Sequence, residues 1–267
     1  MSGPLPETLY KVLPEIYARR LLERGEMQWS SLTWFQNEED IQRGDAFEGS
    51  HRYFPVAGLD VNRHQRDGRP DHARFTLPSH GAVSKAAQSH HIFIYSMTLD
   101  PALAIGEESS RVCVEIFDPV TLTQRVRGAL KRHRTARAET LIHDKVRYWS
   151  PENPPENVWA LPHLLTLHKH KDYEHQREYR LAFGTRANVF DYENIRGYIV
   201  DKDHRWPRLA PHPQAHRIKL RLGNLEDCCR LRLATQAVPA FDQESPAGRC
   251  GMAPTSAACG STICGTR

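Results

Sequence analysis

The sequence predicts an α+β protein built on a bent mixed sheet of short strands with few helices. Short runs rich in β-branched and aromatic residues are scattered along the chain, and only three segments show a substantial helical pattern. Of the 267 residues, 39% are hydrophobic, which is enough to bury a full core. No stretch approaches the roughly 18 apolar residues of a membrane-spanning helix, so we expect no membrane partner.

The first elements are predicted to be a strand, a helix and a second strand. Leu9–Leu13 is an extended run, and the helix that follows it ends at Gly25, a residue that suits a left-handed cap. Met27–Trp29 is expected to form the second strand. A polar loop carrying Trp34 and Phe35 then follows.

The middle of the chain combines a polar segment with a strongly apolar one. Residues 59–90 lack a sustained period, so we expect a mobile insertion with one strand at Arg74–Leu77. His91–Leu99 is continuous and rich in aromatic and β-branched residues, as in a strand buried on both faces, with Arg111–Phe117 as its neighbour. A helix with six Arg or Lys residues is predicted between Asp118 and Arg137.

The remaining elements are mostly short strands. Leu141–Trp149 reads as a strand and residues 157–167 as a helix, followed by strands at Glu178–Phe183, Gly197–Val200 and Ile218–Leu222. From about Gln243 the chain contains almost no large apolar residue and cannot offset its ordering entropy by burial. We therefore predict a single domain over residues 1–242 and a disordered tail over 243–267.

Four blocks of sequence carry a first resemblance. They are Leu9-Tyr10-Lys11 with Gly25-Glu26, Ser31 and Phe35 with Asp45-Ala-Phe-Glu48, Ser96 with Val112–Phe117, and Lys171 with Tyr173–Leu181. Together they cover roughly residues 8–220. In order and spacing they resemble a family of bacterial proteins known only as a domain of unknown function.

A second resemblance rests on three polar motifs. Lys11, or alternatively Arg19 or Arg20, lies early in the chain, and Ser96-Met-Thr98 and Gln176-Arg-Glu178 follow in that order. The same order of a basic residue, a serine strand and a Gln-x-Glu motif is found in mono-ADP-ribosyltransferases of the arginine-serine-glutamate class. The resemblance implies an ADP-ribosyltransferase-like fold with NAD as the substrate and no metal.

That resemblance implies catalytic roles for Glu178 and Gln176. Cleavage of the nicotinamide–ribose bond develops positive charge on the ribose, as in glycoside hydrolysis. The Glu178 carboxylate would accept a hydrogen bond from the ribose 2′-OH and stabilise that charge as it forms. Gln176 is expected on the same side of an extended segment, where it would orient the nucleophile.

The other motif residues are assigned to binding of NAD. Ser96 and Thr98 would hydrogen-bond the glutamate or shape the nicotinamide pocket, and Lys11 would neutralise a pyrophosphate oxygen. Tyr173 and Tyr179 would offer stacking surfaces.

The expected function is NAD-dependent ADP-ribosyl transfer, or NAD hydrolysis, by a bacterial toxin, effector or phage-defence protein. The acceptor is expected to be a protein or nucleic acid. A non-catalytic binding or regulatory domain on the same fold is the alternative, and it is favoured by Lys11 standing where an arginine is expected. Simple structural roles are also open: Glu178 paired with a nearby cation, Ser96 and Thr98 bonded to backbone, and a solvated Lys11.

Other polar clusters point less clearly to chemistry. The four residues His163, His168, His170 and His175 lack a cysteine partner, which disfavours zinc. The set Asp45, Glu48, Glu115, Asp118 and Lys145 lacks the Glu-x-Lys of a restriction-type nuclease core. Cys113 has apolar neighbours, as expected of an inert buried thiol.

The basic run and the N-terminus bear on partners and location. Arg125, Arg127, Lys131, Arg132, Arg134 and Arg137 form a run without acids, expected as a solvated helix face or as a phosphate-tracking surface that steers an acceptor. The first residues lack the basic and apolar regions of a secretory signal. We therefore expect a cytoplasmic protein, with secretion by a signal-independent route as the alternative.

Overall fold

The computed structural model describes residues 2–37, 49–53, 59–64, 70–77, 81–86, 89–102, 111–150, 162–191, 196–201 and 216–232. The chain separates into one unit over residues 1–235 and another over 236–267. The second unit and the predicted tail at 243–267 lie outside the described residues. The described part is a mixed fold with a mostly antiparallel sheet and few helices, in agreement with the predicted α+β class.

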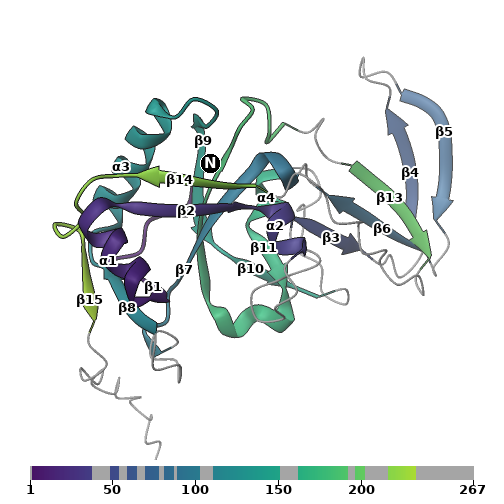
Figure 1. Cartoon of the computed structure of the whole chain (residues 1–267). Helices are drawn as coiled ribbons and strands as arrows, with labels where there is room; N and C mark the ends of the chain where they lie inside the picture. Colours follow the sequence, from purple (N-terminus) through teal and green to yellow (C-terminus); the bar gives the residue numbers. More distant parts are fainter. Residues whose placement is uncertain are drawn as a thin grey trace, which may run out of the picture. The chain divides into compact units, whose positions relative to one another are not determined.

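Eight strands form the main sheet of the described chain (Figure 1). They are β1 (Leu9–Pro14), β2 (Glu26–Ser31), β7 (Ile92–Thr98), β8 (Arg111–Ile116), β9 (Arg137–Lys145), β12 (Glu178–Gly184), β14 (Arg217–Arg221) and β15 (Cys229–Arg232). One path runs β14-β2-β7-β1-β8-β15, and β12 joins β7 to β9. All of these pairings are antiparallel.

The described helices are α1 (Glu15–Arg24), α2 (Leu32–Asn37), α3 (Pro119–Arg132) and α4 (Pro162–Thr166), with short 3₁₀ turns η1 (Ser89–His91) and η4 (Lys171–Gln176). Helix α1 ends at Gly25, which adopts a left-handed φ of 60°, as predicted. Helix α3 begins after Asp118, whose side chain accepts a hydrogen bond from the Thr121 backbone N–H at 3.0 Å.

An aromatic cluster forms the centre of the main core. Trp29 on β2 is fully buried, and its ring centroid lies 5.5 Å from that of Tyr95 and 5.0 Å from that of Phe183. Phe93 stacks on Phe183 at 5.6 Å. The predicted strand at His91–Leu99 is thus confirmed as β7, and its first four residues are all buried.

The polar region at 59–90 contains more strands than predicted. Strands β4 (Leu59–His64) and β5 (Pro70–Leu77) pair as a hairpin, and β6 (Gly81–Ala86) pairs with β3 (Ser50–Tyr53) and β13 (Arg196–Asp201). The strand predicted at Arg74–Leu77 is confirmed as part of β5, but the expectation of one strand in this region is wrong. Strands pair through backbone hydrogen bonds, which any residue except proline can donate. A strand made of polar residues therefore has no periodic apolar pattern by which the sequence could reveal it.

Several other details differ from the predictions. Strand β8 does not neighbour β7, because β1 lies between them. Helix α2 contains Trp34 and Phe35, which were predicted to lie in a polar loop, and β15 was not predicted. A helix was expected at 157–167. The structure describes this segment only from Pro162, where α4 begins. Strand β10 (Arg147–Trp149), the end of a predicted strand, pairs in parallel with β11 (His168–His170).

One edge of β7 is shared by two strands that diverge. Strand β2 pairs with β7 at Phe93 and Ile94, whereas β1 pairs with it only at Thr98. Ser96 lies between these two pairings, where the sheet opens into a gap between β1 and β2. Within the residues that the structure describes, no helix is long and apolar enough to cross a membrane.

Candidate active site

The pairing of β7 with β12 brings four polar side chains to one face of the sheet. Ser96 lies opposite Arg180, and Thr98 lies opposite Glu178. Because every second residue of a strand points to the same face, all four side chains share that face. Positions more than 75 residues apart in the sequence are thereby adjacent.

Glu178 is buried and bound to two cations. Its side chain is 7% exposed, and Arg180 donates from Nε to Oε1 at 2.9 Å and from Nη2 to Oε2 at 3.2 Å. The Lys169 ammonium lies 3.4 Å from Oε2. Arg180 also donates to the Thr166 carbonyl at 2.7 Å. The pairing of Glu178 with nearby cations, which its structural alternative expects, is therefore present.

These contacts determine the protonation of Glu178. Burial by itself raises the pKa of this carboxyl, but the charges of Arg180 and Lys169, together with hydrogen bonds from Arg180 and Ser96, lower it to about 2. The carboxylate is therefore ionised throughout the physiological pH range.

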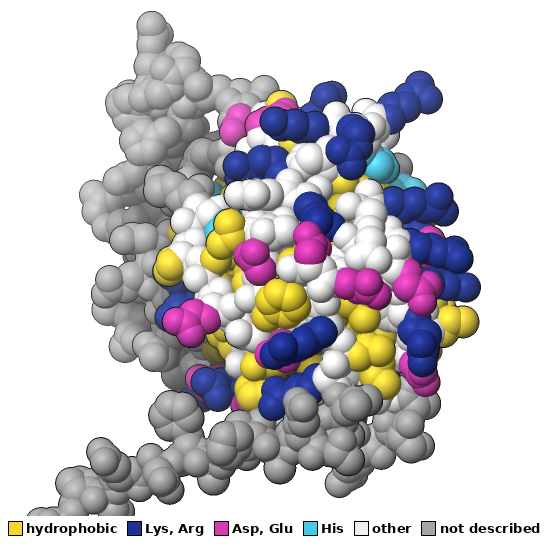
Figure 2. Space-filling model, turned by 90° about the vertical axis from the view of Figure 1, so that its left-hand side faces the viewer, with side chains coloured by type: hydrophobic (Ala, Val, Ile, Leu, Met, Phe, Trp, Pro, Cys, Tyr) yellow, Lys and Arg dark blue, Asp and Glu magenta, His cyan; other side chains and the backbone are white. Residues whose placement is uncertain are grey.

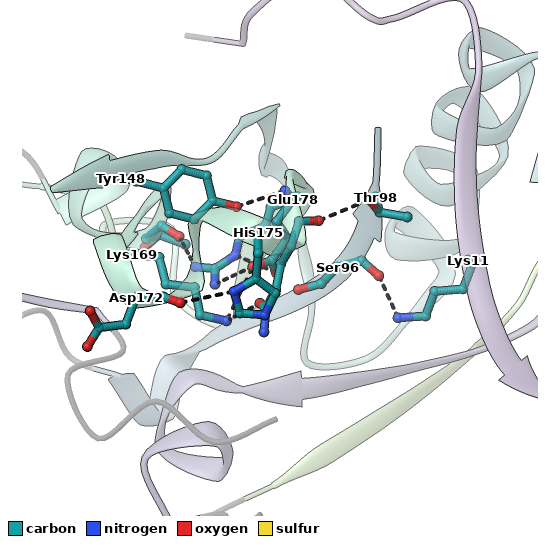
Figure 3. Close-up of polar contacts among 11 residues, drawn as sticks. Lys11, Ser96, Thr98, Tyr148, Lys169, Asp172, His175 and Glu178 are labelled. Carbon is teal, nitrogen blue, oxygen red and sulfur yellow. Dashed lines mark hydrogen bonds and ion pairs between the residues drawn. The ribbon is translucent and has the colours of Figure 1, made fainter. Parts of the chain in front are cut away.

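Ser96 connects Glu178 to the gap in the sheet (Figure 3). Its hydroxyl bonds to Glu178, and its carbonyl accepts a hydrogen bond from Lys11 Nζ at 2.5 Å. The same ammonium lies 4.7 Å from the centre of the Tyr95 ring. Lys11 is thus partly buried at the gap and not a solvated surface lysine.

Gln176 reaches the site through a turn. It ends η4, and Arg177 adopts a left-handed φ of 41° before β12 begins. The prediction that Gln176 and Glu178 lie along one extended segment is therefore wrong. The two side chains nevertheless meet at Lys169, whose Nζ donates to Gln176 Oε1 at 2.8 Å.

Thr98 and Tyr148 hold the backbone around Glu178. The Thr98 hydroxyl donates to the Gln176 carbonyl at 2.9 Å and accepts from the Asp100 N–H at 3.0 Å, so it is bonded to backbone, as the structural alternative expected. The Tyr148 hydroxyl accepts from the Glu178 N–H at 2.8 Å. These bonds fix the turn that precedes β12.

The two tyrosines expected to stack on a ligand have other contacts. The Tyr173 ring lies 4.5 Å from Lys169 Nζ and does not line the cavity described below. Tyr179 is 2% exposed, and its hydroxyl lies 2.9 Å from Nδ1 of His143. The prediction of a stacking surface is therefore wrong for Tyr179, and Tyr173 supports Lys169.

Lys169 is the main residue that the sequence did not reveal. It lies on β11 and its side chain is only 5% exposed. A lysine flanked by two histidines carries no sign of burial, because lysines are almost always exposed. Its contacts with Glu178 and Gln176 show that it enters the site, and β11, which pairs in parallel with β10, carries it there.

One cavity of about 610 Å³ joins the predicted residues. Lys11, Ser96, Thr98, Gln176 and Glu178 all line it, together with Tyr10, Trp34, Phe35, Arg111, Lys169 and Arg217. Of the described residues in this lining, four are Lys or Arg and one, Glu178, carries a carboxylate. Cations combined with aromatic walls suit an anionic ligand with flat rings. We call this space the Glu178 cavity.

The other clusters noted in the sequence do not join this site as a metal centre. His163 packs against Phe190, His168 Nδ1 bonds to the Leu164 carbonyl, His170 lies edge-on to Trp149, and His175 Nδ1 bonds to the Asp172 carbonyl. Among the described residues, no group of three or more His, Cys, Asp or Glu is placed to hold a metal ion.

The residues of the nuclease pattern are engaged elsewhere or lie outside the described part. Glu115 accepts from Arg230 at 2.9 Å, and Asp118 caps α3. Asp45 and Glu48 are not described. Cys113 is buried, and burial raises the pKa of its thiol to about 11, which agrees with the predicted inert thiol.

The basic run is divided between α3 and the residues after it. Arg125 on α3 bonds to the Asp227 carboxylate and the Asn224 carbonyl, and Arg127, Lys131 and Arg132 have exposed side chains. Figure 2 shows the face at the left of Figure 1, where Lys and Arg side chains are interspersed with acidic ones. None of the run's residues lines the Glu178 cavity.

Comparison with protein-family models, with curated proteins and with solved structures finds no match to this chain.

Proposed function

We propose that this chain cleaves NAD and transfers ADP-ribose to a macromolecular acceptor, or to water when no acceptor is bound, on an ADP-ribosyltransferase-like fold. One observation carries the proposal: Lys11, Ser96, Thr98, Gln176 and Glu178 come from β1, β7, η4 and β12 and line one cavity. The Ser96 hydroxyl also bonds to Glu178, as the resemblance implies.

The chemistry proposed for Glu178 is electrostatic. The bond between ribose C1′ and the nicotinamide nitrogen breaks, and its electron pair leaves with nicotinamide. The ionised Glu178 accepts from the 2′-OH and stabilises the positive charge on the ribose. The nucleophile then bonds to C1′ and loses its proton to solvent, because a carboxylate with a pKa of about 2 is a poor base.

The remaining residues position the substrate and the nucleophile. The Gln176 amide, held by Lys169 at 2.8 Å, would orient the nucleophile beside Glu178. Lys11 and Arg111 are cations of the lining that suit the diphosphate, and Tyr10 and Trp34 offer ring faces. Such an enzyme would serve as a bacterial toxin, an effector or a phage-defence protein, with a protein or nucleic acid as the acceptor.

A second candidate is a non-catalytic domain that binds an anionic nucleotide on the same fold. It is favoured by the contacts of Glu178, since both carboxylate oxygens already bind cations. A ribose 2′-OH would have to share Oε1 or Oε2 with Arg180 or Lys169. This candidate predicts NAD binding without release of nicotinamide.

The test uses the full chain, NAD labelled in the adenylate part, and a bacterial lysate. We expect release of nicotinamide and transfer of label, and we expect Glu178→Gln to slow both by about 10²-fold or more, in the range for lost transition-state stabilisation. Glu115→Gln is the matched control, because Glu115 is also a strand glutamate paired with an arginine but lies outside the cavity.

Folding is checked for each variant by circular dichroism and thermal melting. Because Glu178→Gln changes a buried ion pair, Ser96→Ala provides a second variant that keeps both cations paired. Equal NAD turnover in the wild type and in Glu178→Gln would exclude the proposed mechanism. A folded wild type that binds NAD without turnover would instead support the second candidate.

A further inference from the structure

A second cavity of about 390 Å³ lies next to the Glu178 cavity, and the proposed NAD chemistry does not use it. Its lining comes from both sides of the gap between β1 and β2 and from α1, β7, β8 and β14. Four residues line both cavities: Lys11, Val12, Arg111 and Arg217. We call this second space the gap cavity.

The charge of the gap cavity is strongly one-sided. Among the described residues, its lining contains five cations, Lys11, Arg20, Arg111, Arg217 and Lys219, and one acid, Glu26. Glu26 is 9% exposed and already lies 3.7 Å from both the Lys219 ammonium and the Arg221 guanidinium. The carboxylate therefore does not offset the other cations.

Neutral groups hold several of these cations in place. The Arg217 guanidinium stacks on the Trp34 ring at 3.6 Å. With the Gln28 amide turned so that its oxygen faces Arg217, the guanidinium also donates to that oxygen at 3.1 and 3.2 Å. The Arg20 guanidinium lies 6.0 Å from the centre of the Tyr17 ring. Contacts of this kind orient a guanidinium without cancelling its charge.

Bringing like charges together from four elements costs free energy unless an anion lies among them. Arginine guanidinium groups match the oxygens of phosphate in geometry as well as in charge. We propose that the gap cavity is a binding site for an oligophosphate group, carried by a nucleoside polyphosphate or present as free oligophosphate. Lys11, Arg111 and Arg217 are shared with the Glu178 cavity, whereas Arg20 and Lys219 line the gap cavity alone. This site does not depend on the proposed cleavage of NAD.

The test measures binding of inorganic triphosphate to the full chain by calorimetry at low and raised salt. We expect saturable binding of one triphosphate per chain that weakens as salt increases. The double variant Arg20→Gln/Lys219→Gln is expected to weaken it by about tenfold or more, corresponding to about 1.4 kcal/mol. Both residues line the gap cavity and not the Glu178 cavity.

The matched control is Arg19→Gln/Arg24→Gln. Both residues lie on α1, as Arg20 does, and neither lines the gap cavity. The control removes the same net charge and leaves the Arg221 partner of Glu26 in place. Equal weakening by the two double variants, or binding that does not saturate, would overturn the proposal.

Two further arms separate the ligand sources and the two proposals. Adenosine triphosphate that binds more tightly than triphosphate, with no binding of adenosine, would support a nucleotide ligand, and equal affinities would support free oligophosphate. Binding of adenosine without binding of triphosphate would contradict the proposal. Glu178→Gln is expected to retain triphosphate binding even where NAD turnover is lost. The failure of one proposal can therefore be distinguished from the failure of the other.

Discussion

At the scale of single residues, the site is organised by a buried cluster of one anion and two cations. Arg180 and Lys169 hold the Glu178 carboxylate from two sides, and their side chains are 1% and 5% exposed. Removing charges from water is costly, and the cost is recovered only when every charged group keeps its partners. The cluster is therefore sensitive to loss of any single member.

Replacing Arg180 by Met is expected to lower the free energy of unfolding by about 3–5 kcal/mol, because Glu178 would remain buried with only Lys169 as a cationic partner. The Thr166 carbonyl would also lose its donor. Urea unfolding followed by tryptophan fluorescence measures the loss. Arg177→Met is the control, since Arg177 is 62% exposed and pairs with Asp100 at the surface. A similar small loss in both variants would contradict this role of Arg180.

At the scale of elements, α1 and β2 are joined by a turn that only glycine fits. Gly25 has a φ of 60°, and a Cβ at this position would lie 2.4 Å from the Gly223 carbonyl oxygen. Gly223 has a φ of 85°, but a Cβ there would meet no atom within 4 Å. Both glycines therefore adopt a backbone conformation that is unfavourable for other residues. They differ in the space that an added Cβ would find.

Gly25→Ala is accordingly expected to destabilise the protein more than Gly223→Ala. Both substitutions incur about 1–2 kcal/mol for a left-handed conformation, and only the first adds a backbone clash. Thermal melting of the two variants provides the comparison. Equal changes in melting temperature in the two variants would show that the Gly223 carbonyl oxygen leaves room for a Cβ at position 25.

At the scale of the whole molecule, buried titratable groups link stability to pH. Burial lowers the pKa of His168 from 6.5 to about 4, and the ion pairs lower that of Glu178 from 4.5 to about 2. In both cases the unfolded chain binds a proton at a higher pH than the folded chain does. Acid therefore favours unfolding, first through His168 and then through Glu178.

The free energy of unfolding is expected to fall as pH decreases from 6.5 to about 4, and to fall further between 4.5 and about 2. Urea unfolding across this range tests both steps. His168→Leu is expected to flatten the first step only, and the exposed His175→Leu serves as the control. The pKa values of His143 and His163 are also lowered by burial, so part of the first step would remain. An unchanged slope in His168→Leu would contradict the assignment.

Local sequence determined much of the architecture, because burial and backbone conformation leave local signals. The apolar runs of β7 and β12 and the glycine that ends α1 could be identified without a structure, and so could the order of Lys11, Ser96 and Glu178 along the chain. Tertiary structure decided what these residues contact. The shared edge of β7, the gap beside Ser96 and the entry of Lys169 depend on pairing between strands far apart in sequence, and periodicity within one strand carries no information about its partner.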